Sequence, residues 1–244
     1  MVKLNPFLHS VETCRASRVL AKDGEIGKVT DVYLDGQTWI IRYLVADASE
    51  WCGRRSVLIA PHVVRSLDPK GHTISVGISR GRVADSPIID THWPISRAQE
   101  RAYCDYFGYS RYWQHESRSS HRVVGQREHD HLAHAFRSFA YRSRSAPMPD
   151  NAGLQSYRAA RGAEVRAGDG PLGRLDDLLF DPRTWTVRQV VVASGNWHPA
   201  GRVQFAPDWI FEVSWAERYL DVELRRADLL PSTSWKPEIA VTQP

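Results

Sequence analysis

The chain has 244 residues, of which 42% are hydrophobic and 25% are charged. This is the composition of an ordinary folded protein, and it excludes a chain that is disordered throughout. The formal net charge of +4 is too small to indicate nucleic-acid binding by itself. The three cysteines have no CxxC spacing, so they predict neither a disulfide framework nor a zinc site. Residues 1–10 lack an apolar signal core, and the most apolar stretch, residues 40–46, is too short to span a bilayer, so we expect a cytoplasmic protein.

An internal repeat organises the sequence. Residues 8–76 align with residues 154–222, 146 positions later, without a gap, and 19 of the 69 aligned positions are identical. The identities include residue types on which a β fold depends, namely Asp-Gly pairs, further glycines, tryptophans and an Ala-Pro pair. The sequence therefore predicts two copies of one unit of about 70 residues.

Each copy carries the turn and strand signals of a small β unit. Asp23-Gly24 and Asp169-Gly170 each precede an apolar run, which predicts a hairpin because glycine accepts the positive φ of a tight turn. The expected strands cover residues 26–34, 39–47, 57–60 and 74–78 in the first copy and residues 172–180, 185–193, 203–206 and 220–224 in the second. Short strands with regular turn signals predict a mainly β fold with two small antiparallel barrels, each able to fold alone.

A carboxylate and an arginine recur in neighbouring strands of the two copies. We expect Asp31 and Asp177 to face Arg42 and Arg188, respectively, as structural ion pairs. A catalyst would need a pocket and a second group, and both copies carry the same residues. The sequence also has no nucleophile elbow, P-loop or dinucleotide fingerprint, so we expect no enzyme activity, no catalytic residue and no cofactor.

A helix is predicted at the start of the segment between the two copies. Ser96 and Gln99 have the spacing of a capping box, and Gly108 is a terminator. The expected apolar stripe of this helix consists of Ala102, Tyr103, Tyr106 and Phe107, and the aromatic residues Tyr109, Tyr112 and Trp113 follow it. Two interpretations stay open: the helix packs onto the first barrel, or the aromatic side chains form an exposed patch that binds a partner.

The rest of this segment is basic and contains several histidines. Residues 108–150 hold seven arginines against four acidic residues, and Leu132, Phe136 and Phe139 recur at helical spacing. The residues His129, His131 and His134 are candidate metal ligands, because imidazole suits zinc, nickel or copper. No carboxylate or cysteine completes the set, so we expect a solvated histidine-rich linker and no metal site.

The first copy resembles a known family. The pattern DGEIGKVTDVYLDGQTWIIRYLV at residues 23–45, followed by Trp51, residues 57–59 and Pro61, is similar to the PRC-barrel. The second copy keeps this frame in DGPLGRLDDLLFDPRTWTVRQVVV at residues 169–192. The PRC-barrel is shared by the cytoplasmic part of the photosynthetic reaction centre H subunit and by the ribosome maturation factor RimM.

The resemblance extends to the residues after the first copy and implies a domain organisation. Ser86-Pro87 and Tyr112-Trp113 bound a stretch that is similar to the connector of tandem bacterial PRC-barrel proteins. The implied segments are a PRC-barrel repeat at 1–85, a basic, aromatic-rich, partly helical and partly flexible connector at 86–150, a second PRC-barrel repeat at 151–230, and a C-terminal tail at 231–244.

Because the family is known for docking modules, the resemblance implies a non-enzymatic cytoplasmic adaptor that binds a protein partner or a second copy of itself. One alternative is an RNA- or ribosome-associated factor of the RimM kind, which would bind nucleic acid through the connector arginines. Another is an accessory protein of a photosynthetic or electron-transport membrane complex, attached peripherally, as the H subunit resemblance implies.

Tryptophan and arginine side chains in the loops supply the interaction candidates. Trp beside Arg is a common pairing at protein interfaces, although a tryptophan at the root of a loop also caps a barrel. The candidates are Trp51, Arg54 and Arg55 in the first copy, Trp197 and Arg202 in the second, and Tyr109, Tyr112 and Trp113 in the connector.

Overall fold

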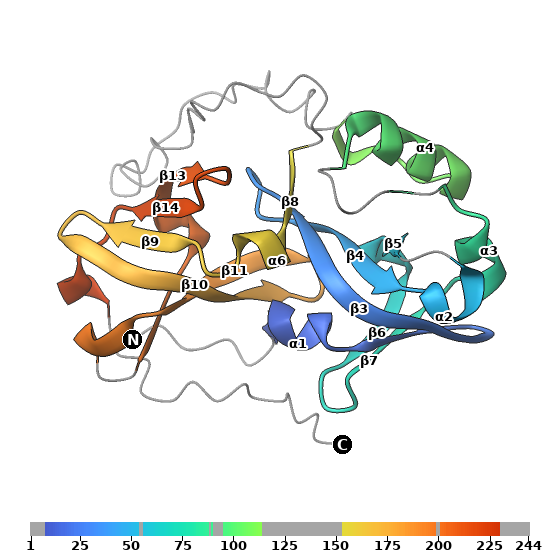
Figure 1. Cartoon of the computed structure of the whole chain (residues 1–244), viewed down its shortest axis with the longest axis horizontal. Helices are drawn as coiled ribbons and strands as arrows, with labels where there is room; N and C mark the ends of the chain where they lie inside the picture. The colour runs from blue at the N-terminus through green and yellow to red at the C-terminus, as the bar shows by residue number, and fades with distance from the viewer. Residues whose placement is uncertain are drawn as a thin grey trace, which may run out of the picture.

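The computed structural model describes residues 8–53, 56–87, 89, 95–113, 153–198 and 201–229. These residues form a mainly β structure with two mixed sheets, one of them curled into a half-barrel, and a helical connector region (Figure 1). Among them, no helix is long and apolar enough to cross a bilayer. The expected helix near Leu132 and the candidate ligands His129, His131 and His134 lie outside the described residues.

The first sheet is built from the first copy. Its strands are β2 (Arg18–Ala21), β3 (Gly24–Asp35), β4 (Ile41–Asp47), β5 (Val57–Ile59), β6 (Val64–Asp68) and β7 (Thr73–Val76). They lie side by side in the order β5-β4-β3-β2-β7-β6. All four strands predicted for this copy are present, and β2 and β6 are additional to the prediction.

The second sheet repeats this arrangement. Its strands are β9 (Glu164–Ala167), β10 (Gly170–Asp181), β11 (Thr186–Ala193), β12 (Arg202–Phe205), β13 (Ile210–Ser214) and β14 (Tyr219–Val222). Their order, β12-β11-β10-β9-β14-β13, is the order of the first sheet shifted by one repeat. The duplication predicted from the sequence is therefore confirmed at the level of strand order.

The prediction of purely antiparallel sheets is wrong in one respect. β2 runs parallel to β7, with Val19 opposite Ile74, and β9 runs parallel to β14, with Val165 opposite Leu220. β2 and β9 have four residues each, with a single β-branched residue, Val19 or Val165, and no aromatic one, so they show no run of strand-forming residues. The prediction therefore lacked β2 and β9, the strands that pair with the last predicted strand of each copy.

Two glycines allow the long strands to bend sharply. Gly27 has φ +145° and Gly173 has φ +141°, values that essentially only glycine adopts. A Cβ atom at Gly27 would lie 1.6 Å from the carbonyl oxygen of Asp47, and one at Gly173 would lie 1.9 Å from that of Ala193. The register against the preceding strand also shifts at each glycine, so both mark a β-bulge that curls the sheet.

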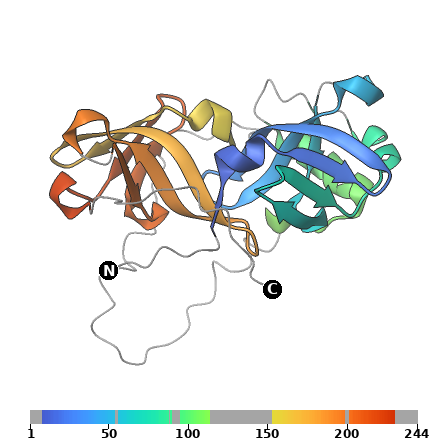
Figure 2. The same cartoon turned by 90° about the horizontal axis from the view of Figure 1, so that it is seen from below.

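The two copies exchange their first elements. β1 (His9–Ser10) belongs to the first copy but pairs with β10 of the second, with Ser10 opposite Leu179. β8 (Leu154–Ser156) belongs to the second copy but pairs with β3 of the first, with Ser156 opposite Tyr33. Each of these strands leads into a short helix, α1 (Val11–Arg15) or α6 (Tyr157–Ala160). We call β1–α1 and β8–α6 the two hooks; α1 and α6 lie where the sheets meet (Figures 1 and 2).

The repeated aspartates hold these hooks. The Ser10 hydroxyl donates to Oδ2 of Asp177 at 2.5 Å, and the backbone N–H of Glu12 donates to Oδ1 at 3.1 Å. In the other direction, the Ser156 hydroxyl donates to Oδ2 of Asp31 at 2.5 Å, and the N–H of Arg158 donates to Oδ1 at 3.0 Å. Each carboxylate therefore caps the first turn of a helix from the other copy.

The predicted ion pairs of these aspartates with Arg42 and Arg188 are wrong. Arg42 instead pairs with Asp35, with 3.3 Å between Nη2 and Oδ2, and Arg188 is exposed. The register of β3 on β4 shifts between Val29 and Asp31, and again beside Arg42. Each bulge interrupts the alternation of side chains along the strands. Counting residues therefore does not show whether the Asp31 carboxylate and the Arg42 guanidinium lie on the same face of the sheet.

The two copies also meet through their backbones. The N–H of Ile41 donates to the carbonyl of Trp185 at 2.8 Å, and the N–H of Val187 donates to the carbonyl of Trp39 at 2.8 Å. Trp39 and Trp185 are equivalent residues, and both have φ +57°. The two sheets are thus related by an approximate two-fold axis, and their buried side chains form one contiguous core.

The helices complete the described structure. They are α2 (Ser49–Cys52), α3 (Arg80–Ala84), α4 (Arg97–Phe107) and the 3-10 turns η1 (Pro61–Val63), η2 (Gly195–Trp197), η3 (Pro207–Trp209) and η4 (Arg226–Asp228). The predicted connector helix is confirmed as α4: Ser96 and Gln99 form the capping box, and Gly108 ends the helix with φ +72°. The predicted segment boundaries at residues 85, 150 and 230 stay predictions.

Candidate functional site

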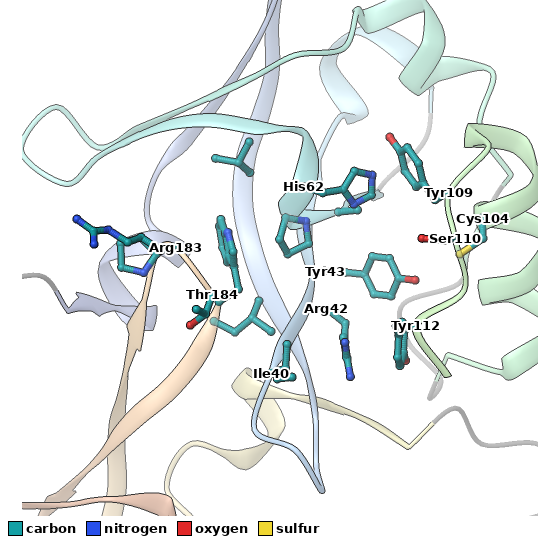
Figure 3. A pocket seen from close by; sticks show the side chains of 16 residues that line it. Ile40, Arg42, Tyr43, His62, Cys104, Tyr109, Ser110, Tyr112, Arg183 and Thr184 are labelled. Carbon is teal, nitrogen blue, oxygen red and sulfur yellow. The ribbon is translucent and has the colours of Figure 1, made fainter. Parts of the chain in front are cut away.

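A groove of about 460 Å³ opens where the first sheet, the connector and the second copy meet (Figure 3). Its lining comes from residues 40–43 at the start of β4, residues 60–62 and 64 around η1, Cys104, Tyr109, Ser110 and Tyr112 of the connector, and residues 182–185 of the β10–β11 turn. We call this feature the junction groove. Its volume lies within the range of sites that hold a small ligand or a few side chains of a partner.

An arginine stacked on a tyrosine forms one end of the junction groove. The Cζ atom of Arg42 lies 3.6 Å from the centroid of the Tyr112 ring, and the Tyr112 ring also packs against Trp113, with centroids 4.9 Å apart. Arg97 lies over the Trp113 ring at 4.5 Å. These cation–π contacts fix the Arg42 guanidinium in orientation, fasten Tyr112 to the first sheet and fasten Trp113 to α4.

A buried carboxyl group lies behind this end of the groove. The Glu100 side chain is 0% exposed and accepts hydrogen bonds from the hydroxyls of Tyr43 at 3.0 Å and Tyr112 at 2.9 Å, and from Nη1 of Arg97 at 2.6 Å. Burial raises the pKa of Glu100, and Arg97 opposes that shift. Burial, together with the proximity of Glu100, also raises the pKa of the Tyr43 and Tyr112 hydroxyls, so both remain protonated donors.

We expect Glu100→Ala to lower the free energy of unfolding by about 3 kcal/mol, because buried donors lose their acceptor. The change would be measured by urea unfolding. Arg101→Ala is the matched control, since Arg101 is exposed on the same helix, and it should change the stability by less than about 0.5 kcal/mol. Equal effects of the two substitutions would show that the hydrogen bonds of Glu100 do not stabilise α4 on the sheet.

The connector helix packs onto the first sheet, as one of the two interpretations predicts. The Tyr103 hydroxyl donates to the carbonyl of Leu58 at 3.0 Å, and its ring meets the Tyr43 ring edge-on at 5.4 Å. The predicted stripe is only partly right: Tyr103 and Phe107 are buried, but Ala102 and Tyr106 are exposed. Their expected places are taken by Glu100 and Cys104, because the helix turns its polar Glu100 towards the two tyrosine hydroxyls.

A histidine and a tyrosine form the upper wall of the groove. The rings of His62 and Tyr109 meet at 88° with centroids 3.8 Å apart. Desolvation lowers the pKa of His62, so the imidazole is neutral at neutral pH. The positive charges of the groove lining are therefore those of Arg42 and Arg183, and the lining contains no carboxylate.

The predicted interaction residues fall into two groups. Tyr109 and Tyr112 line the junction groove, and Trp113 supports Tyr112. Trp51 and Trp197 cap their own sheets instead, because their indole N–H groups donate to the carbonyls of Ile26 at 2.5 Å and Leu172 at 2.7 Å.

The remaining predicted residues do not line the groove. Arg202 forms an ion pair with Asp176, with 2.8 Å between Nη2 and Oδ2. Arg54 and Arg55 lie outside the described residues. In the part of the chain that the structure describes, no group of three or more His, Cys, Asp or Glu side chains could hold a metal ion. Burial raises the pKa of the Cys14 thiol to about 12, so this thiol is not reactive at neutral pH.

The approximate two-fold symmetry relates the junction groove to a second junction between the copies, where other residues pack. On that side, the Trp215 ring packs on Trp39 with centroids 5.8 Å apart, and a Cβ atom at Gly36 would lie 2.7 Å from Nε1 of Trp215. The residues equivalent to Trp215 and Gly36 beside the open groove are Pro69 and Pro182. A tryptophan thus packs on Trp39 at one junction, whereas the junction with the groove carries prolines at both equivalent positions.

The positions of Arg42 and Arg183 in the lining of this groove could not be predicted from the identities between the two copies. The groove could have been sought at the aligned positions where the two copies carry different residues. Among these, Tyr43 is equivalent to Gln189, Pro69 to Trp215, and Pro182 to Gly36. No family model matches this chain, and no curated protein matches it. What can be said of its function therefore depends on the geometry of the two sheets and of the groove between them.

Proposed function

We propose that this protein is a PRC-barrel-like, non-enzymatic cytoplasmic docking protein whose junction groove receives part of a partner protein. The repeated motif at residues 23–45 and 169–192 supports the family, and the paired sheets agree with a duplicated β unit. The observation that carries the function is the difference between the two junctions. Trp215 packs on Trp39 at one of them, whereas the other, where the equivalent residue is Pro69, has a groove lined by arginine and tyrosine.

The construction of the groove supports a docking role. The lining comes from both copies and from the connector; the exchanged hooks hold the two copies together, and Tyr103 and Glu100 hold the connector helix on the first sheet. A surface that is fixed before binding loses less conformational entropy when a partner arrives, which favours affinity. Tyrosine and arginine are also the residue types that contribute most to binding energy at protein interfaces.

A variant with a covered groove tests this function. Pro69→Trp with Pro182→Gly reproduces at the open junction the Trp215–Gly36 pair of the other one; both changes are needed because a Cβ atom at Gly36 would collide with Trp215. We expect the double variant to keep the circular dichroism spectrum and melting temperature of the wild type. In affinity purification of full-length protein from native cells, it should lose partners that the wild type retains.

Phe211→Arg is the matched control for the covered groove. Phe211 is 49% exposed on β13, outside the groove lining, and the equivalent residue of the first copy is Arg65. This control should retain the same partners as the wild type. Nuclease treatment of the extract separates the RNA-associated alternative, because partners held through RNA would then be lost from every variant. Partners that stay bound to the covered groove would contradict the proposal.

A further inference from the structure

We infer that an aromatic and acidic surface at the edge of the second sheet binds residues 131–145 of the connector of the same chain. The surface lies where β13 begins and β14 ends, and we call it the edge surface. Its members are exposed or partly exposed, namely Asp208, Trp209, Phe211, Glu212 and Glu223. The edge surface lies outside the lining of the junction groove, so this inference is independent of the docking function proposed above.

Two exposed aromatic side chains form the centre of the edge surface. In the part of the chain that the structure describes, three large hydrophobic side chains are exposed, and two of them are Trp209, at 48%, and Phe211, at 49%. β13 is the last strand of its sheet, and among the described strands it pairs with β14 alone (Figure 1). Large rings on an open sheet edge are typical of a surface that binds another segment.

Three carboxylates accompany these rings. Asp208 and Glu223 are exposed, and the backbone N–H of Glu223 donates to the carbonyl of Trp209 at 2.8 Å, so Glu223 lies directly beside the tryptophan. Glu212 is partly exposed and accepts a hydrogen bond from the Tyr219 hydroxyl at 3.0 Å. The edge surface is therefore negatively charged as well as aromatic, which suits an occupant that is both basic and apolar.

One arginine lies on the same side of the sheet, but it is already paired. Arg166 stacks over the Tyr219 ring at 3.8 Å, and its guanidinium donates to both carboxylate oxygens of Asp221, at 2.6 and 2.7 Å. Asp221 lies opposite Glu212 in the register of β13 and β14. The charge of Arg166 is thus balanced by Asp221, and the carboxylates of the edge surface keep their net negative charge.

The equivalent place in the first copy is neither acidic nor open. The backbone N–H of Gly77 donates there to the carbonyl of Val63 at 2.8 Å, so the positions correspond in space as well as in sequence. Val63 is buried, and Arg65 lies against the backbone of Gly77, where a Cβ atom would be 2.6 Å from its Nε atom. The second copy has Asp208, Trp209, Phe211, Glu212 and Glu223 where the first has His62, Val63, Arg65, Ser66 and Gly77. The second copy has thus gained three carboxylates and two rings at this place and lost one arginine.

The connector contains a segment of complementary composition. Residues 131–145 include three arginines and no acidic residue. Leu132, Phe136 and Phe139 recur in it at helical spacing, which predicts an apolar stripe beside the arginines. Residues 230–244, in contrast, contain one lysine and one glutamate. Charge complementarity therefore favours residues 131–145 over the C-terminal tail as the occupant of the edge surface.

The connector also re-enters the described structure close to β13. The N–H of Gly36 donates to the carbonyl of Gly153 at 3.2 Å, and Gly36 lies against Trp215, the residue that follows β13. Residues 146–152, which join the segment to Gly153, can span about 25 Å when extended. β13 has five residues and is about 17 Å long. Residues 131–145 can therefore reach the whole edge surface from the point where the chain re-enters the fold.

A photo-crosslinking side chain at position 211 of the full-length protein tests the inference. Replacing Phe211 by p-benzoylphenylalanine keeps an aromatic ring at the edge surface. After irradiation, we expect mass spectrometry to find crosslinks to residues 131–145, and a mixture of ¹⁵N-labelled and unlabelled protein distinguishes crosslinks within one chain from crosslinks between two chains. The same probe at Glu50, which is exposed on α2 of the first copy, is the control and should not crosslink to this segment.

A double variant gives a second, independent measurement. Phe211→Arg with Glu223→Gly reproduces at the edge surface the Arg65–Gly77 pair of the first copy. Backbone amides of residues 131–145 should then exchange hydrogen about fivefold or more faster than in the wild type, because a ring and a carboxylate that hold the segment are gone. Glu50→Arg changes the net charge equally and should leave the exchange rates unchanged. Both variants should keep the melting temperature of the wild type.

The outcomes identify the occupant. Crosslinks to residues 131–145 within one chain, together with faster exchange in the double variant, would support the inference. It would be overturned by crosslinks to residues 230–244, by crosslinks to residues 131–145 that occur only between two chains, by the absence of any crosslink to the segment, or by equal exchange in the double variant and the wild type. Each of these results would leave the docking function of the junction groove standing.

Discussion

Replacing Asp177 by alanine is expected to lower the free energy of unfolding by about 3 kcal/mol, and Asp31→Ala should do the same. Each substitution removes the acceptor for a serine hydroxyl and a helix N–H of the hook from the other copy. The combined loss of about 6 kcal/mol approaches the whole stability of a typical domain, so the double variant should be largely unfolded at 25 °C.

Because the hooks are exchanged, each single substitution should loosen only the hook that belongs to the other copy. In hydrogen-exchange measurements, Asp177→Ala should expose residues 9–15 of the first copy, whereas Asp31→Ala should expose residues 154–160 of the second. Asp208→Ala is the control, since Asp208 is exposed, and it should change stability by less than about 0.5 kcal/mol. Loss of protection in the hook of the same copy would show that the hooks are not exchanged.

The pH dependence gives a second measurement on Asp177. Burial raises the pKa of this carboxyl, while hydrogen bonds from Ser10 and Glu12 oppose the shift. A carboxyl whose folded-state pKa is raised contributes stability that is fully present below the unfolded-state value of about 4 and is lost as pH rises through the folded-state pKa. The stability of the wild type relative to Asp177→Asn should therefore fall with rising pH over this window and then level off.

Gly27→Ala and Gly173→Ala are each expected to cost about 3 kcal/mol or more, because alanine is strained at these φ values and its Cβ meets a carbonyl oxygen of the adjacent strand. The clash is with backbone, so no side chain can move aside to relieve it. Urea unfolding of the two single variants measures the effect.

Gly168→Ala is the matched control for the two strained glycines. A Cβ atom at Gly168 would meet nothing within 4 Å, so this variant should stay within about 0.5 kcal/mol of the wild type. If Gly27→Ala lowered the free energy of unfolding no more than Gly168→Ala does, β3 and β4 would not approach one another as closely as described. Such a result would remove the physical basis for the curled sheet.

Local chemistry made the elements of each copy predictable. Asp23-Gly24 and Asp169-Gly170 start the long strands, and the spacing of Ser96 and Gln99 places the start of α4. These signals act within a few residues of one another, so they can be found without knowledge of the fold. The repeat then required that both copies adopt one strand order, which the structure confirms.

The partner of a side chain was predictable only where that partner is local. The trans-copy contacts of Asp31 and Asp177 join residues that lie more than 120 positions apart, as with Ser156 and Arg158 on Asp31. Two short strands of two and three residues carry these contacts, and such strands show no periodicity. The bulges in β3 also break the count that would have placed Arg42 across from Asp31.

The duplication of one β unit, with its turns, its long strands and its connector helix, could be predicted from the amino-acid sequence, because these features depend on interactions between near neighbours in the chain. The exchange of hooks and the different packing at the two junctions became apparent in three dimensions. Both features depend on contacts between residues that are distant in sequence, and a difference such as Pro69 against Trp215 acquires meaning only when its surroundings in space are known.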